Sequence, residues 1–182
     1  MSRVIRRTGE TDVTVECAFD AAHAGPADVD TGDPFLDHML VTFARYAGTR
    51  LSVHARGDLR HHLVEDVAIT LGAALARAWP EASRRYADAL VPMDDALVQA
   101  TLDAGGRPYY EGRLPSRLYE HFLRSLAHAA GWTLHIRVLR GRDRHHVVEA
   151  AVKALGLCVR EAARETGAVF STKGRVEMEV SD

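Results

Sequence analysis

The sequence predicts an α/β fold: an α+β two-layer sandwich made from a duplicated half-domain, with helices packed on one face of a mixed sheet. Two observations predict it. A motif that reads His-His-x-Val-Glu occurs at 61–65 and at 145–149, and each copy opens a segment with apolar residues at helical spacing. Upstream, residues 36–51 align with residues 119–134, so both halves place strands and helices in the same order.

The first half predicts strands and helices in alternation. Residues 12–19 alternate between apolar and polar side chains, which is typical of a strand with one buried face. A helix begins at Pro34, because proline suits the first helical turn, and it ends at Gly48. A strand over 50–55 then leads to the first motif helix, which ends before Pro80.

The second half repeats this order. Strands are expected over 89–91 and 97–103, followed by a helix over 118–130 that ends at Gly131. A strand over 133–139 alternates cleanly and leads into the second motif helix. The pattern has too few strand–helix alternations, and no glycine-rich phosphate loop, for a doubly wound sheet.

Length and composition fit an ordinary globular domain. We expect one domain over 1–182, made of two pseudo-symmetric halves at about 3–86 and 87–175. A net charge of -2 gives no reason to expect a nucleic-acid or membrane partner. No signal peptide or transmembrane run is evident, and Cys17 and Cys158 are expected to be reduced, so we expect a cytoplasmic protein.

The repeated motif contains metal-ligating side chains. Residues four apart share a helix face, so His61 and Glu65 can bind one ion together, as can His145 and Glu149. The second histidine of each pair points roughly 100° away and must contact something else. Imidazole and carboxylate suit Mn, Fe, Co, Ni or Zn better than Ca or Mg. The alternative is a polar helix start with solvated histidines, but two matched copies favour metal.

The duplication predicts two equivalent sites, because it exchanges His38 with His121 and one motif with the other. For His38 or His121 alone, a core or capping role would be the simpler interpretation. Two sites of three histidines and one glutamate use every member once. One set is His61, Glu65, His121 and His146, and the other is His145, Glu149, His38 and His62. Four protein ligands leave open positions on a six-coordinate ion, which is typical of catalytic sites.

Cationic loop residues are candidates for phosphate binding. Ser171, Thr172 and Lys173 bring hydroxyls, backbone N–H groups and a cation together. Arg85 and Arg107 lie at the ends of expected elements. Taken alone, each of these segments is more often a surface turn.

Several segments resemble the imidazoleglycerol-phosphate dehydratase family of histidine biosynthesis. The resemblance spans about residues 3 to 175 and includes both motif helices, in the order that the family has them. The other matching segments are Thr31-Gly32-Asp33-Pro34-Phe35-Leu36-Asp37-His38-Met39-Leu40, Val91-Pro92-Met93-Asp94-Asp95-Ala96-Leu97, Gly106-Arg107-Pro108-Tyr109 and Ser171-Thr172-Lys173-Gly174.

The resemblance implies a hydro-lyase that converts D-erythro-imidazoleglycerol phosphate to imidazole acetol phosphate and water. The family uses two Mn²⁺ ions per active site, bound by residues that match the eight ligands above, and proceeds through an imidazolate and a diazafulvene-like intermediate. The implied fold is of the ribosomal S5 domain 2-like kind. The implied assembly is a homo-oligomer, a 24-mer of octahedral symmetry, whose active sites are completed at subunit contacts.

The resemblance also implies roles for individual residues. A carboxylate must move protons, and the candidates are Glu10 and Glu149, with Glu65 as the counterpart of Glu149 in the other half. The positions that match substrate-binding residues of the family, together with the Thr172 that lies among them, are Glu10, Arg85, Arg107, Ser171, Thr172 and Lys173.

This chain departs from the family beside the first motif. Only Arg60 separates Leu59 from His61, where family members usually have several more residues, including acidic ones. We expect this shortening to affect how His61 or His62 is oriented, because residues behind a metal ligand set its direction.

Two other functions remain open. One is a catalytically idle relative that binds metal and keeps the shell assembly but has no turnover. The other is a dinuclear hydrolase of phosphate esters, although the histidine-rich ligand set argues against it, because such enzymes usually rely on bridging aspartates.

Overall fold

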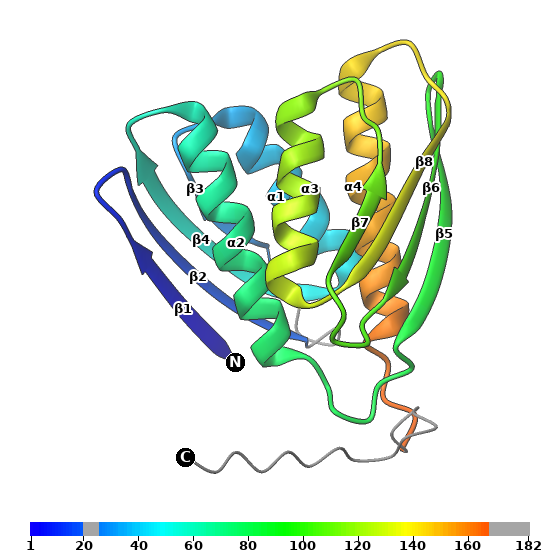
Figure 1. Ribbon diagram of the computed structural model, residues 1–182, viewed down its shortest axis with the longest axis horizontal. Helices are drawn as coiled ribbons and strands as arrows, with labels where there is room; N and C mark the ends of the chain where they lie inside the picture. The colour runs from blue at the N-terminus through cyan, green and yellow to red at the C-terminus, as the bar shows by residue number, and fades with distance from the viewer. Residues whose placement is uncertain (20–25, 168–182) are drawn as a thin grey trace, which may run out of the picture.

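Two four-stranded mixed sheets with four helices between them make up the part of the chain that the computed structural model describes, residues 1–19 and 26–167 (Figure 1). The first half contains β1 (Ser2–Arg7), β2 (Thr11–Phe19), β3 (Asp28–Asp30), α1 (Pro34–Ala47), β4 (Thr49–Gly57) and α2 (Arg60–Ala78). The second contains β5 (Tyr86–Met93), β6 (Ala96–Asp103), β7 (Tyr109–Gly112), α3 (Arg117–Ala130), β8 (Thr133–Arg140) and α4 (Arg144–Ala162).

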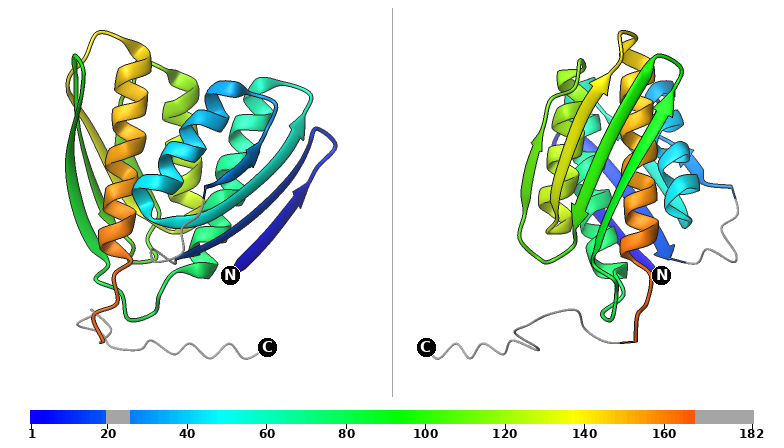
Figure 2. Two further views of the ribbon diagram at one scale, coloured as in Figure 1. Left: turned by 180° about the vertical axis from the view of Figure 1, so that it is seen from behind. Right: turned by 90° about the vertical axis from the view of Figure 1, so that its right-hand side faces the viewer.

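The two halves have the same topology. The strand orders are β1-β2-β4-β3 and β5-β6-β8-β7, and in each sheet only the short third strand, β3 or β7, pairs in parallel. Each sheet carries helices on its inner face, and the helices of the two halves meet in the middle, α2 against α3 and α1 against α4 (Figure 2). The predicted duplicated α/β unit is confirmed, and each half has a sheet of its own.

Two matched glycines let the helices of the two halves approach closely. A Cβ atom on Gly72 in α2 would lie 2.6 Å from the carbonyl oxygen of Leu126 in α3. A Cβ atom on Gly156 in α4 would lie 2.7 Å from Cβ of Tyr46 in α1. Both distances are far below van der Waals contact, so only glycine fits without displacing a neighbour. The close approach brings each motif helix against a helix of the other half.

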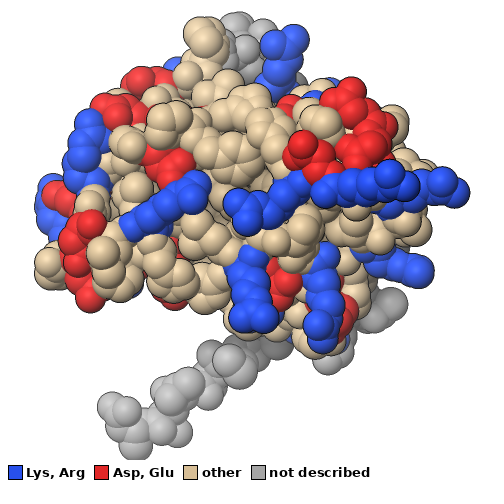
Figure 3. All heavy atoms as spheres, turned by 90° about the horizontal axis from the view of Figure 1, so that it is seen from above, with Lys and Arg blue, Asp and Glu red and all other residues tan. Residues whose placement is uncertain are grey.

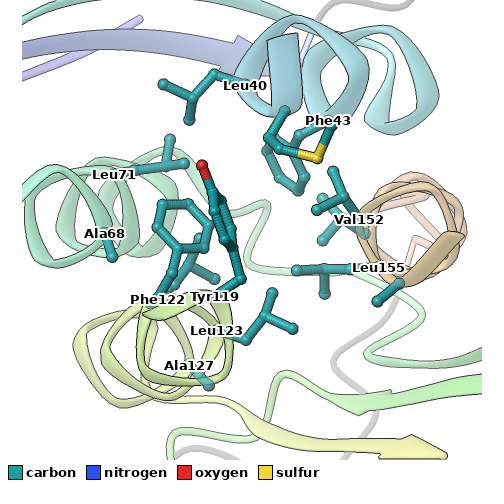
Figure 4. Close-up of a cluster of buried hydrophobic side chains, with 14 of the residues drawn as sticks. Leu40, Phe43, Ala68, Leu71, Tyr119, Phe122, Leu123, Ala127, Val152 and Leu155 are labelled. Atoms are coloured by element: carbon teal, nitrogen blue, oxygen red, sulfur yellow. The ribbon is translucent and has the colours of Figure 1, made fainter. Parts of the chain in front are cut away.

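The core lies between the helices and on the inner faces of the sheets. Figure 4 shows side chains from all four helices converging on it. Leu40 and Phe43 come from α1, and Leu123 and Leu155 come from α3 and α4; all are at most 3% exposed. This shared core fixes both halves relative to each other, and with them the polar ends of the four helices.

The strands differ most from expectation at the sheet edges. The strand expected over 89–91 is wrong in extent, because β5 runs from Tyr86 to Met93 and includes Pro92. Proline is tolerated there because β5 is an edge strand. The strands β1, β3 and β7 were not expected. They are also edge strands, and β3 and β7 are too short to show an alternating pattern.

Both cysteines are buried in the core, where Cys17 is 1% exposed and Cys158 is 0% exposed. Burial raises the pKa of the Cys17 thiol to about 11 and that of Cys158 to about 12. We expect both thiols to be protonated and unreactive toward Ellman's reagent at pH 8 in the folded protein, and to react fully in denaturant. Rapid reaction of the folded protein would contradict this.

In the described residues, no helix combines the length and the apolar character that crossing a membrane requires.

Candidate metal centre

A first group of metal-ligating side chains lies between α2 and α3. The Nε2 atom of His61 is 3.6 Å from Glu65 Oε2, and both side chains come from the first turns of α2. From α3, Nε2 of His121 lies 3.2 Å from Glu65 Oε1. The ligand atoms of the three residues lie within 4.8 Å of one another, so one ion can contact all three.

A second group lies between α4 and α1. The Oε2 atom of Glu149 is 3.0 Å from Nε2 of His145 and 3.2 Å from Nε2 of His38. This is the arrangement of the first group with the roles of the two halves exchanged. We call the two groups the α2–α3 cluster (His61, Glu65 and His121) and the α4–α1 cluster (His145, Glu149 and His38).

The structure thus brings together three of the four ligands predicted for each site. The fourth ligands, His146 and His62, do not join these clusters within the chain. As helical spacing predicts, each second histidine of a motif turns away from the first. The rings of His61 and His62 meet edge-on, with centroids 6.2 Å apart.

His62 is held by acidic residues of its own half. Its Nδ1 atom is 2.9 Å from Asp58 Oδ1 and 3.5 Å from Glu10 Oε2. The hydrogen bond with Asp58 raises the pKa of His62 and lowers that of Asp58. A histidine that binds metal through one ring nitrogen commonly donates from the other to a carboxylate, so His62 is oriented as a metal ligand would be.

His146 repeats this arrangement in the second half. Its Nδ1 atom is 2.7 Å from Asp95 Oδ1, and its Nε2 atom is 3.3 Å from Asp94 Oδ2. Hydrogen bonds from His146 and from the backbone N–H groups of Arg142 and Asp143 lower the pKa of Asp95 to about 2. The hydrogen bond that His146 donates to Asp95 also raises the pKa of His146. Both second histidines therefore have a carboxylate behind Nδ1.

The donor groups of the clusters fit a divalent cation. The Nε2 atom of His121 is buried and has no hydrogen-bond partner among the described residues, although Glu65 lies close to it. Burial raises the pKa of Glu149, but hydrogen bonds from Lys153 and His38 outweigh this, so the pKa is lowered overall. A carboxylate that stays ionised between two imidazoles is the usual ligand set for a borderline divalent metal.

The shortened segment before the first motif keeps an acidic residue in place. Asp58 contacts His62, so this histidine is oriented despite the shorter loop. The helix starts differ, however: the side chain of Asp143 caps α4, whereas α2 begins after Leu59 without a side-chain cap. Arg60 instead forms an ion pair with Asp33, whose other carboxylate oxygen caps α1.

Removal of the Asp58 carboxylate tests its part in metal binding. We expect Asp58→Ala to weaken Mn²⁺ affinity about 10- to 100-fold, because His62 loses the acceptor that orients its ring. Titration of metal-free protein with Mn²⁺, followed by electron paramagnetic resonance, measures this. Asp88→Ala, on the exposed edge strand β5, is the matched control and should leave affinity unchanged. Equal affinities of the two variants would remove Asp58 from the site.

The predicted phosphate-binding arginines lie at the opposite end of the molecule. The backbone N–H of Arg85 donates to the carbonyl of Ala162, the last residue of α4. The helix spans 19 residues from Arg144 to Ala162, so this end lies about 27 Å from the start of α4. The carbonyl of Arg107 accepts a hydrogen bond from Thr133, which places its loop at the same end (the lower end in Figure 1).

Arg85 has a left-handed backbone conformation and a bidentate ion pair with Asp103. Its φ of 74° is left-handed, a conformation that costs energy for a residue with a Cβ atom and is enriched at functional sites. Its guanidinium contacts both carboxylate oxygens of Asp103, at 2.6 and 3.0 Å. The other predicted phosphate-binding residues lie outside the described residues; they are Ser171, Thr172 and Lys173.

Figure 3 views the molecule from above, onto the end at which α2 and α4 begin and the two clusters lie. The sequence interpretation missed several residues at this metal end. Lys153 lies 2.9 Å from Glu149 Oε1, and its spacing of four residues in α4 could have revealed it. Asp58 lies four residues before His62, so its spacing also offered a signal, whereas Asp94 and Asp95 had no comparable signal for contact with His146. Both come from a hairpin turn far away in the sequence.

Comparison with known proteins gives one consistent family. A model of the imidazoleglycerol-phosphate dehydratase family matches residues 31–159. The chain is 45% identical over 192 residues to imidazoleglycerol-phosphate dehydratase of Halorhodospira halophila, covering 95% of this chain and 96% of that protein. It is 46% identical over 187 residues to the protein of the same name from Methanothermobacter thermautotrophicus, covering 94% and 95%.

Two solved structures share the fold. The crystal structure of IGPD from Pyrococcus furiosus in complex with (S)-C348 has a TM-score of 0.84 and 40% identity, covering 94% of this chain and 99% of that chain. Imidazoleglycerol-phosphate dehydratase from Staphylococcus aureus has a TM-score of 0.77 and 29% identity, covering 90% and 99%. The segment matched by the family model contains all six residues of the two clusters.

Proposed function

Because the chain belongs to the imidazoleglycerol-phosphate dehydratase family, we propose that it removes water from D-erythro-imidazoleglycerol phosphate to give imidazole acetol phosphate in histidine biosynthesis. The observation that carries this proposal is the pair of matched clusters, one at each contact between the two halves. A substrate that contains an imidazole ring has two ring nitrogens, and two metal sites can address both. We propose a cytoplasmic enzyme whose partner is this small phosphate ester.

The proposed cofactor is Mn²⁺, with two ions per active site. The α2–α3 cluster supplies three ligands to one ion and the α4–α1 cluster supplies three to the other, with His146 and His62 as the fourth ligands. When bound by these residues, Mn²⁺ would supply Lewis acidity to the imidazole ring and so favour departure of the hydroxyl on the neighbouring carbon. Glu65 and Glu149 hold these ions and orient the histidines around them.

We assign proton transfer chiefly to Glu10. Its side chain is 57% exposed, and its carboxylate approaches Nδ1 of His62 at 3.5 Å, so it lies beside a proposed metal ligand yet can still reach substrate. The hydrogen to be removed lies on a carbon next to the ring and is not acidic by itself. A carboxylate within hydrogen-bond reach of it can accept the proton once the ring is activated.

An active site completed by a second subunit would account for two features of the single chain. Within one chain, His62 and His146 do not join the clusters, and the end of α4 that Arg85 contacts lies about 26 Å from His145. If the arginine end of one subunit meets the metal end of another, phosphate and metal can bind one small substrate together. We propose that this happens in a homo-oligomer, a 24-mer with octahedral symmetry, and that Ser171, Thr172 and Lys173 join Arg85 and Arg107 at the phosphate.

The test is turnover of imidazoleglycerol phosphate by chelator-stripped protein, with and without added Mn²⁺. We expect stripping to abolish turnover and Mn²⁺ to restore it, because the ligands alone cannot activate the ring. Added Mg²⁺ is the control, since it prefers oxygen ligands and should restore little. No turnover by protein that binds Mn²⁺ and assembles would favour the idle relative. Release of inorganic phosphate would favour the hydrolase.

A further inference from the structure

Asp66 is a buried carboxylate that faces away from the metal ligands. It follows Glu65 directly in α2, yet it is only 7% exposed, because it points toward the first hairpin. Its Oδ2 atom accepts a short hydrogen bond from the hydroxyl of Thr11, and its Oδ1 atom lies 2.9 Å from Nε of Arg6. One buried side chain thus ties both strands of the β1–β2 hairpin to α2.

The hairpin turn attached in this way carries Glu10. The hydroxyl oxygen of Thr8 accepts hydrogen bonds from the backbone N–H groups of Glu10 (3.1 Å) and Thr11 (3.0 Å). It also lies 3.1 Å from the hydroxyl of Thr11, which in turn bonds Asp66. The carbonyl of Glu10 accepts from the backbone N–H of Asp58 at 3.1 Å. The backbone of Glu10 is therefore held on both sides.

The second half contains the same junction without these polar groups. A Cβ atom on Gly57 would lie 3.1 Å from Thr11, and one on Gly141 would lie 3.2 Å from Ala96, so Ala96 occupies the place of Thr11. Ala150 follows Glu149 as Asp66 follows Glu65, and it is fully buried. The half-domain therefore forms its hairpin and motif helix with two alanines in these places.

From this difference we propose that Asp66 is a positioning residue for Glu10. Through Thr11 and Thr8 it fixes the turn from which the Glu10 carboxylate reaches the metal end beside His62. Burying an ionised group is expensive unless it is well paired, and the second half shows that the fold does not need it. The inference rests on the proposed role of Glu10 in proton transfer.

The test replaces Thr11 and Asp66 with alanine, the residue that the second half has at both equivalent positions. The double variant Thr11→Ala, Asp66→Ala should assemble, bind Mn²⁺ with an affinity within about threefold of wild type, and keep its KM within about threefold. Its kcat should fall about 10- to 100-fold, because a displacement of about 1 Å at a catalytic group costs that much. Asp12→Ala is the matched control, since it removes the exposed 3.1 Å ion pair with Arg7 on the same hairpin and should leave kcat unchanged.

A double-mutant cycle separates positioning from a general structural role. In a Glu10→Gln background, the two alanine substitutions should lower kcat no further, because Glu10 no longer depends on its placement. If Glu10→Gln alone keeps full turnover, the proposed role of Glu10 fails. If Glu10→Gln loses turnover but the alanine variant keeps its kcat, the role stands and this inference is overturned.

A smaller substitution covers the case in which the double variant does not assemble. Thr11→Val keeps the shape of the side chain and removes only the hydroxyl that bonds Asp66. We expect its kcat to fall severalfold or more with KM nearly unchanged, and the Glu10→Gln background should again abolish the effect. Wild-type kcat in Thr11→Val would overturn the inference.

Discussion

Replacing Glu149 with Gln is expected to lower kcat by at least about 10³-fold, because the carboxylate serves a metal and is a candidate for proton transfer. Its Oε2 atom lies between His145 and His38, and the charge of Lys153 is balanced on its other oxygen. The glutamine amide keeps the shape of the glutamate side chain. It loses the negative charge that a bound metal ion and the Lys153 ammonium both require. The phosphate is proposed to bind Arg85 and Arg107 rather than Glu149, so affinity for inorganic phosphate should remain.

Steady-state turnover, particle size and phosphate affinity measure this prediction together. Glu16→Gln is the matched control: it makes the same change in β2, where Glu16 forms a 3.0 Å ion pair with Arg3. It should keep full turnover. Turnover of Glu149→Gln within a few fold of wild type, in fully assembled particles, would remove Glu149 from both proposed roles.

Mixed particles made from two inactive variants, His62→Ala and His145→Ala, are expected to recover about one quarter of wild-type turnover. His145 belongs to the α4–α1 cluster, whereas His62 faces Asp58 in the same chain. If His62 completes this site on a neighbouring subunit, a site that takes its cluster from one variant and His62 from the other is intact. Random mixing makes about one site in four of this kind.

The control pairs two lesions in one cluster. Particles mixed from His145→Ala and His38→Ala should stay inactive, because both residues come from the same chain in the α4–α1 cluster. Co-expression with two affinity tags, followed by sequential purification, isolates the mixed particles for assay. Recovery in the control pair, or none in the test pair, would contradict ligand sharing between subunits.

The sequence by itself determined the features that depend on local spacing. The motif helices begin before their histidines and end at Ala78 and Ala162, as the apolar spacing predicts. The pairing of His61 with Glu65, and of His145 with Glu149, follows from one turn of helix. Repetition of the motif indicated two sites, because equivalent residues in a duplicated fold must occupy equivalent places.

Other features of the site depend on contacts between segments that are distant in the sequence. The spacing of residues along the chain does not predict such contacts. His121 and His38 reach the motif helices because Gly72 and Gly156 let the helices of the two halves touch. Glu10 beside His62 and Asp95 behind His146 come from hairpin turns that only strand pairing brings near. Local periodicity fixes which side chains share a helix face, whereas packing decides what that face meets. Only the tertiary structure therefore placed the arginines at the far end, and left His62 and His146 outside the clusters.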